Sequence, residues 1–301
     1  MTDLFAVAGI SRQGYYKALK VREEANTDIE RYILLIIGMR DIHPGMGLRE
    51  IYRITEPEGI GRDAFMLLGL RNGFQLQCRP NPVRTTFSTK SHRYANLLQG
   101  KRFTDVNQVW SSDITYFQAH GITYYIVFIL DVYSRRIVGW NVETHMRTEN
   151  LMLALDKALA LRSINEYANT LIHHSDKGTQ YASNLYTSAL GQRNILISMC
   201  NEVYENTHIE RVNGTIKNQY LDYWLHLITD LSSLKRLLDK VVHTYNTLRP
   251  HAALNHLTPI TFETQLLTMP IQDRPILTIY TNPFQFKNVT NNDFAQLKLD
   301  L

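Results

Sequence analysis

Hydrophobic and polar positions follow two different patterns along the chain. Up to about residue 100, apolar residues recur at helical spacing and are interrupted by glycine and proline. This pattern predicts helices over residues 28–39, from Gly47 to just before Pro57, and over residues 62–70. Two short helices joined by a glycine-bearing turn are typical of a helix-turn-helix, but equally of a generic helical bundle.

After residue 109 the pattern changes to short apolar runs separated by helical stretches. The predicted order is a strand at 113–117, a hairpin of strands at 124–131 and 136–142, a helix at 148–161, a strand at 171–175, a helix at 183–193 and a strand at 195–199. Asp230 then caps a helix that runs to Tyr245. This order predicts an α/β fold with a mixed sheet flanked by helices. Residues 267–301 show no clear period.

Composition narrows the class of protein. The 301 residues suffice for two or three domains, and the 44% hydrophobic share is normal for a globular core. Cys78 and Cys200 lie far apart, which argues against a disulfide scaffold and favours a reducing compartment. The longest apolar run, residues 124–130, is far shorter than the roughly 20 residues of a membrane span, and no signal peptide is evident. We therefore expect a cytoplasmic protein without a membrane partner.

Charge is distributed unevenly although the formal net charge is only +4. One stretch carries six basic residues and no acidic ones: Arg79, Arg84, Lys90, Arg93, Lys101 and Arg102. Such a stretch can follow a phosphate backbone or can be a solvated linker.

Three carboxylates stand in distinctive local sequences. Asp113 lies in WSSDITYF (110–117), Asp176 follows an apolar strand in HHSDKGTQY (173–181), and Glu210 lies in NTHIERVNGTIK (206–217). A carboxylate on a buried strand needs a compensating positive charge, and strand ends are where ligands bind in open α/β sheets. Carboxylates from separate elements suit a hard cation such as Mg²⁺. Each aspartate taken alone reads more simply as a turn or cap residue.

The sequence around Glu210 predicts one amphipathic helix over residues 206–223. At about 100° per residue, one buried stripe is expected to comprise Ile209, Val212, Ile216, Tyr220 and Tyr223. Asn206, Glu210, Asn213 and Lys217 share the neighbouring polar face. The glutamate can then reach a metal, while the amides and the ammonium can contact a phosphate backbone; an ordinary solvated face is the alternative.

Other candidate residues carry weaker signals. His174 shares a strand face with Asp176 and could tune the site, although a packed histidine is equally consistent. The histidines and Cys200 do not have the spacing of a zinc site. Asp131 is expected to cap a turn, with Arg135 or Arg136 as its cation or as phosphate ligands. No Walker-type loop indicates ATP use.

These segments together resemble the catalytic core of insertion-sequence transposases of the OrfB type, which carry a DDE triad and belong to the retroviral-integrase superfamily. Residues 130–140 (LDVYSRRIVGW) are similar to that family's second and third strands, and residues 245–254 and 257–259 to its closing motif. Residues 47–74 resemble its helix-turn-helix and residues 9–16 its usual opening, so the likeness covers roughly residues 4–266. Thirty-three residues separate Asp176 from Glu210, fewer than is usual in this family, which leaves Glu202 and Glu205 as alternatives.

The resemblance implies a ribonuclease-H-like fold and a DNA transposase that cleaves and transfers the ends of an insertion sequence. Asp113, Asp176 and Glu210 would hold Mg²⁺ (or Mn²⁺), with two ions expected. It also implies DNA partners, a homo-oligomer and an upstream OrfA-type protein. The expected domains are a helical helix-turn-helix region (1–78), a basic linker (79–104), a catalytic core (105–266) and a tail of unassigned role (267–301). The expected DNA contacts are Asn206, Asn213, Lys217, Lys177, Arg84, Lys90, Arg93, Lys101 and Arg102.

Two other functions fit the same residues. One is a DNA-binding regulator with an inactive core, against which the intact carboxylates argue. The other is a ribonuclease-H-like nuclease acting on another nucleic acid, against which the basic stretch and the helix-turn-helix argue modestly. Cleavage of end DNA would separate the first from a transposase, and substrate preference would separate the second.

Overall fold

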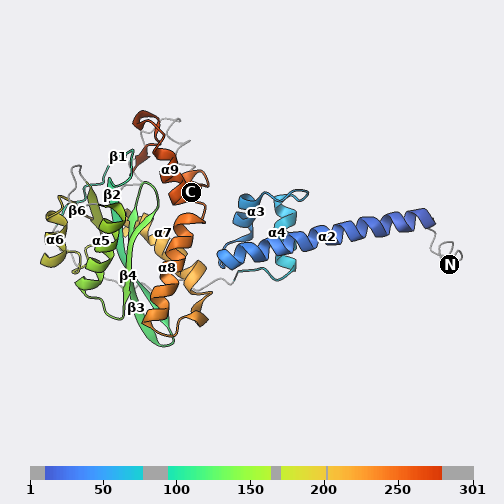
Figure 1. The fold of residues 1–301 in the computed structure, drawn as a ribbon, viewed down its shortest axis with the longest axis horizontal. Helices are drawn as coiled ribbons and strands as arrows, with labels where there is room; N and C mark the ends of the chain where they lie inside the picture. The colour runs from blue at the N-terminus through green and yellow to red at the C-terminus, as the bar shows by residue number, and fades with distance from the viewer. Residues whose placement is uncertain (1–10, 77–93, 164–170, 201–202, 280–301) are drawn as a thin grey trace. The chain divides into compact units, whose positions relative to one another are not determined.

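The computed structural model describes residues 11–76, 94–163, 171–200 and 203–279 (Figure 1). The chain divides into two compact units, residues 1–81 and residues 82–301. None of the helices in these described ranges is both long and apolar enough to cross a membrane.

The described part of the first unit is helical, with α2 (Arg12–Ile42), α3 (Leu48–Thr55) and α4 (Arg62–Arg71). Gly69 lets α4 lie against α3, because a Cβ atom there would come within 2.7 Å of a Leu48 methyl carbon. The three predicted helices are confirmed. Helix α2 begins at Arg12, well before the predicted start. The apolar pattern did not mark this beginning because residues 13–18 are exposed and carry no buried stripe. The small core of this unit comprises Tyr32, Ile36, Met46, Leu48, Ile51 and Phe65.

The second unit is built on a five-stranded mixed sheet, as predicted. Its order is β4-β3-β2-β5-β6, with β2–β3 and β3–β4 antiparallel and β2–β5 and β5–β6 parallel. The strands are β2 (Val109–Ala119), β3 (Ile122–Asp131), β4 (Ile137–Glu143), β5 (Ile172–Ser175) and β6 (Leu196–Met199). Strand β2 starts earlier than predicted because residues 109–112 pair with β5 on one side, and residues 110–112 also pair with β3 on the other.

Helices cover both faces of this sheet (Figure 1). Helices α5 (Thr148–Arg162) and α6 (Asn184–Gly191) share a core with Val127 and Ile129 of β3. Helices α7 (Thr207–Ile216) and α8 (Leu231–Thr247) share the other core with Ile126 and Phe128 of the same strand. Because side chains alternate along a strand, both faces of β3 are buried, which explains its continuous apolar run.

The predicted helix over residues 206–223 is shorter than expected. It begins after a 3₁₀ turn (Val203–Asn206), and a π-helical segment (Lys217–Leu221) follows α7. The wider π turn rotates the residues after it relative to a regular helix. Tyr220 is therefore buried as predicted, whereas Tyr223 is 39% exposed and leaves the stripe.

A third core joins the ends of the second unit. Strand β1 (Arg102–Phe103) pairs with β7 (Leu277–Thr278), and α9 (Pro259–Leu266) packs beside them. Three short 3₁₀ turns complete the described chain: Leu225–Leu227, Ala252–Leu254 and Ile271–Asp273. Residues 277–278, which showed no pattern, are thus held by pairing with a distant strand.

Asp131 caps the turn between β3 and β4, as predicted. The side chain is fully buried and accepts backbone N–H bonds from Tyr133 (3.1 Å), Ser134 (3.0 Å) and Asn107 (2.7 Å). Its cationic neighbour is Arg162 at 3.5 Å, which corrects the expectation of Arg135 or Arg136. Arg162 and Arg136 each lie 2.5 Å from Glu263 of α9, so a network of partly buried charges ties α9 to the sheet.

Candidate active site

Strand pairing places two of the three predicted carboxylates side by side. Ser112 of β2 is in register with Ser175 of the parallel strand β5. Asp113 and Asp176 are the next residues on these chains, and neighbouring strands lie about 4.8 Å apart. The hairpin between β2 and β3 continues past Asp113, which pairs with Phe128. The central strand β2 thus carries Asp113 at the level where its neighbour β5 ends and Asp176 follows.

The turn after β5 fixes the second aspartate. The backbone N–H of Gly178 donates to Oδ1 of Asp176 at 2.9 Å, an Asx-type turn. A Cβ atom on Gly178 would lie 2.9 Å from the same oxygen, so a larger residue would displace the carboxylate. The absence of a side chain at Gly178 therefore leaves room for the Asp176 carboxylate.

Helix α7 brings the third carboxylate and is fastened to β2 by two amides. Asn213 donates from Nδ2 to Oδ2 of Asp113 at 2.8 Å. Asn206 donates from Nδ2 to the Ser112 carbonyl at 3.2 Å and accepts from the Ser111 hydroxyl. Glu210 stands between these two asparagines on the helix, in its first turn, and is exposed.

The electrostatics tie the three acids together. Burial, together with the negative charges of Asp176 and Glu210, raises the pKa of Asp113 to about 7. Lys217 opposes this shift. Burial also raises the pKa of Asp176. A cluster of carboxylates that resist ionisation is chemically suited to a divalent cation.

Glu205, one of the two alternatives to Glu210, has a different setting. It accepts a hydrogen bond from Asn96 Nδ2 at 2.9 Å, and it is not among the main groups that shift the pKa of Asp113. Glu202, the other alternative, lies outside the described residues.

The two asparagines correct one expectation. Asn206 and Asn213 are only 4% and 5% exposed, so they do not lie on a face open to a phosphate backbone. They bind strand β2 instead, because the helix is seated closer to the sheet than a simple amphipathic pattern indicates. Lys217 on the same side is partly buried, and burial lowers its pKa, although Asp113 opposes that effect.

His174 is a packed residue rather than an exposed ligand. It is 1% exposed, and its Nδ1 lies 2.9 Å from the Ser198 hydroxyl. Burial lowers its pKa to about 4, so the imidazole is neutral at neutral pH. This setting favours the structural alternative over site tuning.

Other predicted DNA contacts fall in two groups. Lys101 and Arg102 are exposed, Arg102 on β1, and Lys177 is partly buried beside Asp176. Arg84, Lys90 and Arg93 lie outside the described residues.

The sequence interpretation missed three polar residues behind the carboxylates. Ser111 and Ser112 are 3% and 0% exposed. The Ser111 hydroxyl and the Ser112 carbonyl hydrogen-bond Asn206 at the start of α7, and the Ser112 hydroxyl lies 2.8 Å from the Tyr181 hydroxyl. Tyr181 is 1% exposed, and burial raises its pKa well above the usual value. Two consecutive serines beside Asp113 in the strand were a signal that partners approach from elsewhere in the fold.

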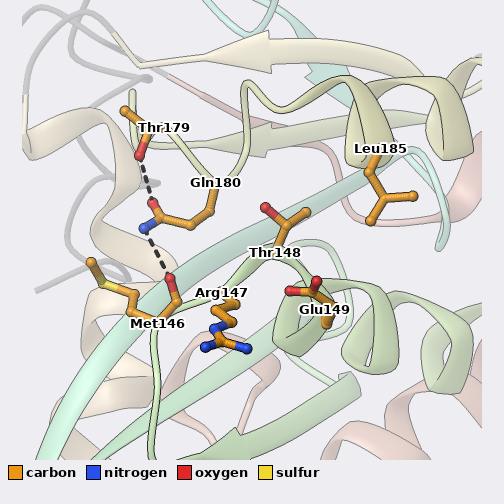
Figure 2. Close-up of a pocket in the computed structure, with 7 residues that line it drawn as sticks. All are labelled: Met146, Arg147, Thr148, Glu149, Thr179, Gln180 and Leu185. Atoms are coloured by element: carbon orange, nitrogen blue, oxygen red, sulfur yellow. Dashed lines mark hydrogen bonds between the residues drawn. The ribbon is translucent and has the colours of Figure 1, made fainter.

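A shallow pocket of about 440 Å³ opens near the turn that follows Asp176 (Figure 2). Gln180 reaches across its edge, donating from Nε2 to the Met146 carbonyl at 3.3 Å. The side chain of Arg147 is among those that line it, as Figure 2 shows. The full lining is Met146, Arg147, Thr148, Glu149, Thr179, Gln180 and Leu185.

No three or more His, Cys, Asp or Glu side chains of the described ranges converge closely enough to form a ready metal site. The geometry is instead two adjacent aspartates with an exposed glutamate on the helix beside them. Such an open arrangement can close around a cation, since the glutamate side chain has rotational freedom.

The chain resembles known proteins in sequence. Residues 104–203 and 197–259 match two family models, each described as an integrase core domain. The chain is 31% identical to a transposase for insertion sequence element IS629 of Shigella sonnei over 67% of this chain and 72% of that protein. It is 30% identical to an uncharacterized 31 kDa protein of insertion element IS600 of Shigella sonnei, over 85% and 96%. A structure of the HTLV-2 integrase catalytic core domain in complex with magnesium aligns over 56% of this chain and 99% of that one, at 20% identity and a TM-score of 0.43.

Proposed function

The chain belongs to the family of insertion-sequence transposases with an integrase core domain, and we propose that it cleaves and transfers DNA ends through Asp113, Asp176 and Glu210. The observation that carries this assignment is geometric: the strand register puts Asp113 and Asp176 on neighbouring strands, and Asn213 of the helix that carries Glu210 donates to Asp113 at 2.8 Å. Asp113 lies on β2, Asp176 directly follows the neighbouring strand β5, and Glu210 lies in the first turn of α7.

The donor set fits a hard divalent cation such as Mg²⁺ or Mn²⁺. Carboxylate oxygens are the ligands these ions prefer, and a cation would relieve the repulsion that raises the Asp113 pKa. Bound at these residues, two ions would activate the attacking water or hydroxyl and stabilise the leaving oxygen. No ATP is required, because the phosphodiester itself supplies the leaving group.

The protein's own groups would orient this site. Asn213 would hold Asp113 through its 2.8 Å hydrogen bond, and the Gly178 N–H would hold Asp176. Glu210 is exposed and free to turn towards the aspartates. Lys217 follows Glu210 by about two helical turns. It would pair with a phosphate near the reacting group.

The reaction has two steps of one chemistry. Water first attacks a phosphodiester at the element's end and releases a 3′-hydroxyl. That hydroxyl then attacks a second phosphodiester in line, so one P–O bond forms as another breaks and the proton passes to the leaving oxygen. No covalent protein–DNA intermediate is needed.

The rest of the assembly is proposed on the same basis. Two DNA ends have to be joined, which favours a homo-oligomer. Helices α3 and α4 would form the helix-turn-helix that binds DNA, and the basic stretch between the units would follow the backbone. An upstream OrfA-type protein would add specificity for the ends.

A strand-transfer assay tests this function. Labelled duplexes carrying the ends of the element would be incubated with the full chain, a target plasmid and Mg²⁺. Asp113→Asn, Asp176→Asn and Glu210→Gln should each reduce product by at least about a thousandfold, the scale seen when a group acting only in the transition state is removed. Glu205→Gln is the matched control and should retain activity, since Glu205 is bonded to Asn96. Binding without cleavage by the unmodified chain, even with the upstream protein added, would instead indicate a regulator.

A further inference from the structure

The shallow pocket beside the turn after β5 lies next to the candidate carboxylates and takes no part in the chemistry proposed above. Thr179 and Gln180 line the pocket and follow Asp176 by three and four residues. A Cβ atom on Gly178 would lie 2.9 Å from Oδ1 of Asp176 and 3.4 Å from Oε1 of Gln180, so these two oxygens are close neighbours. A ligand held at Asp176 can therefore extend into the pocket.

The lining of the pocket is mixed in character and carries no net charge. Arg147 and Glu149 contribute one positive and one negative group, and both side chains are exposed. Met146 and Leu185 add apolar side chains that are 39% and 53% exposed, drawn on either side of Thr148 in Figure 2. The Thr148 hydroxyl can donate or accept a hydrogen bond. The pocket thus offers donors, acceptors and apolar surface together.

This chemistry suits a nucleobase better than a phosphate. A phosphate would meet the Glu149 carboxylate as well as the Arg147 guanidinium, so repulsion would offset attraction. A nucleobase is uncharged, carries donors and acceptors on its edge, and has a flat face that packs on apolar and aromatic side chains. The volume of about 440 Å³ lies within the range usual for ligand pockets.

An exposed tyrosine stands at the rim of the pocket. Tyr116 follows Asp113 by three residues on β2, and because side chains alternate along a strand it shares a face with Ile114, which packs against the core under α5 and α6. The Tyr116 hydroxyl donates to Sδ of Met146 at 3.7 Å, and its ring packs edge-on against Tyr125 at 5.4 Å. Tyr116 is 37% exposed, so it presents a fixed aromatic surface of the kind on which bases stack.

We propose that this pocket, with Tyr116 at its rim, binds an unpaired nucleobase of the DNA strand whose scissile phosphate lies at the three carboxylates. The assignment rests on the proposed function for the presence of DNA at this point. Successive phosphates of one strand lie about 3.4 Å apart along the axis, so the base belongs to a nucleotide at or next to the reacting phosphate. A base held outside the stack no longer covers that phosphate, and the pocket would keep the end open while the phosphate reacts.

Two DNA probes that differ only in base pairing test the pocket without requiring catalysis. Both are fluorescein-labelled duplexes of equal length and arbitrary sequence, one fully paired and one with non-complementary bases at one end. The full chain is titrated by fluorescence anisotropy without divalent metal. Stacking of one base on a protein side chain is worth about 5-fold to about 150-fold in affinity, so the unmodified chain should bind the frayed probe at least about fivefold more tightly.

Matched variants locate the origin of this preference. Leu185→Ala and Tyr116→Ala remove apolar and aromatic walls and should each reduce the preference below about twofold, with binding of the paired probe unchanged. Leu153→Ala and Tyr223→Ala are the controls, since these side chains are 47% and 39% exposed and do not line the pocket; both should keep the preference. Tryptophan fluorescence during thermal unfolding confirms that each variant is folded. If Tyr116→Ala is not, the comparison of Leu185→Ala with Leu153→Ala decides.

Arg147→Gln separates a nucleobase from a phosphate as the ligand. For a nucleobase, the variant should weaken the preference for the frayed probe and leave the salt dependence of paired-probe binding unchanged. For a phosphate, it would weaken binding of both probes equally and lower the slope of log K against log salt by about 0.9, which would overturn the nucleobase assignment.

Equal binding of the two probes by the unmodified chain would also overturn the assignment, as would the same preference in Leu185→Ala and Leu153→Ala. Failure of the proposed function gives a different result. The preference and its loss in the pocket variants would then persist, while the unmodified chain would not cleave end DNA in the presence of Mg²⁺.

Discussion

Replacing Asp113 by asparagine should stabilise the protein at neutral and higher pH when no divalent cation is present. Burial and two neighbouring carboxylates raise the pKa of Asp113 to about 7. Its ionised form is therefore disfavoured in the folded state relative to the unfolded chain. Asparagine removes that charge and can still accept the bond from Asn213.

The pKa gives the size and the pH window of the effect. A carboxyl with a higher pKa in the folded state binds a proton on folding, so it reduces stability as pH rises from about 4 to about 7. The full rise from 3.8 to about 7 corresponds to about 4 kcal/mol. Because part of the repulsion is shared with the other acids, we expect about 2 kcal/mol, or about 4–8 °C in Tm for a unit of this size.

The assay is thermal unfolding followed by tryptophan fluorescence. All three tryptophans, Trp110, Trp140 and Trp224, belong to the second unit, so the signal reports on the unit that holds the site. At about pH 8 with a chelator, Asp113→Asn should melt higher than the parent, and near pH 4 the two should coincide. Asp156→Asn, an exposed acid on α5, is the control and should change little.

Addition of Mg²⁺ should reverse the order. A ligand that binds only the folded state stabilises it in proportion to its affinity, and the parent has the better site. The reasoning would be refuted by a variant that melts at or below the parent at about pH 8 in chelator, or by a gain that is the same near pH 4.

Three further changes test the fold and the site. Glu263→Gln leaves two partly buried arginines without their carboxylate and should cost about 3 kcal/mol in urea unfolding; a loss below about 0.5 kcal/mol would contradict the network. Gly139→Ala should cost about 1–3 kcal/mol in the same assay, because the new Cβ would lie 2.2 Å from a carbonyl oxygen of α5. Gly191→Ala should be neutral or stabilising, because no atom lies within 4 Å of the position its Cβ would take. Asn213→Ala should lower strand-transfer activity about tenfold to a hundredfold with unchanged DNA affinity, and unchanged activity would show that its bond to Asp113 is not used.

Periodicity was sufficient for the order of elements in both units. Each predicted strand of the sheet and each predicted helix beside it is present, because β3 carries a continuous apolar run that only a sheet covered on both faces can bury. The start of α2 was missed, since an exposed helix shows no apolar stripe. The π segment after Ile216 was missed because a change in residues per turn leaves no signature in a short sequence.

The sequence was enough to propose the candidate carboxylates but not their surroundings. Local sequence pointed to Asp113, Asp176 and Glu210; the strand register places the two aspartates on neighbouring strands, and their catalytic role stays a prediction. The roles of Asn206 and Asn213 depend on how closely α7 approaches β2, which is a tertiary property. A helical wheel places both on a polar face and cannot show that this face meets another strand.

Metal-specific rescue would test the central claim most directly. Asp113→Cys replaces a hard oxygen ligand by a softer thiolate, which suits Mn²⁺ better than Mg²⁺. If Asp113 holds the catalytic cation, strand transfer by this variant should be lost in Mg²⁺ and partly restored in Mn²⁺, while Asp113→Asn stays inactive in both. Equal activity of Asp113→Cys in the two metals, whether high or absent, would contradict the assignment of Asp113 as a metal ligand.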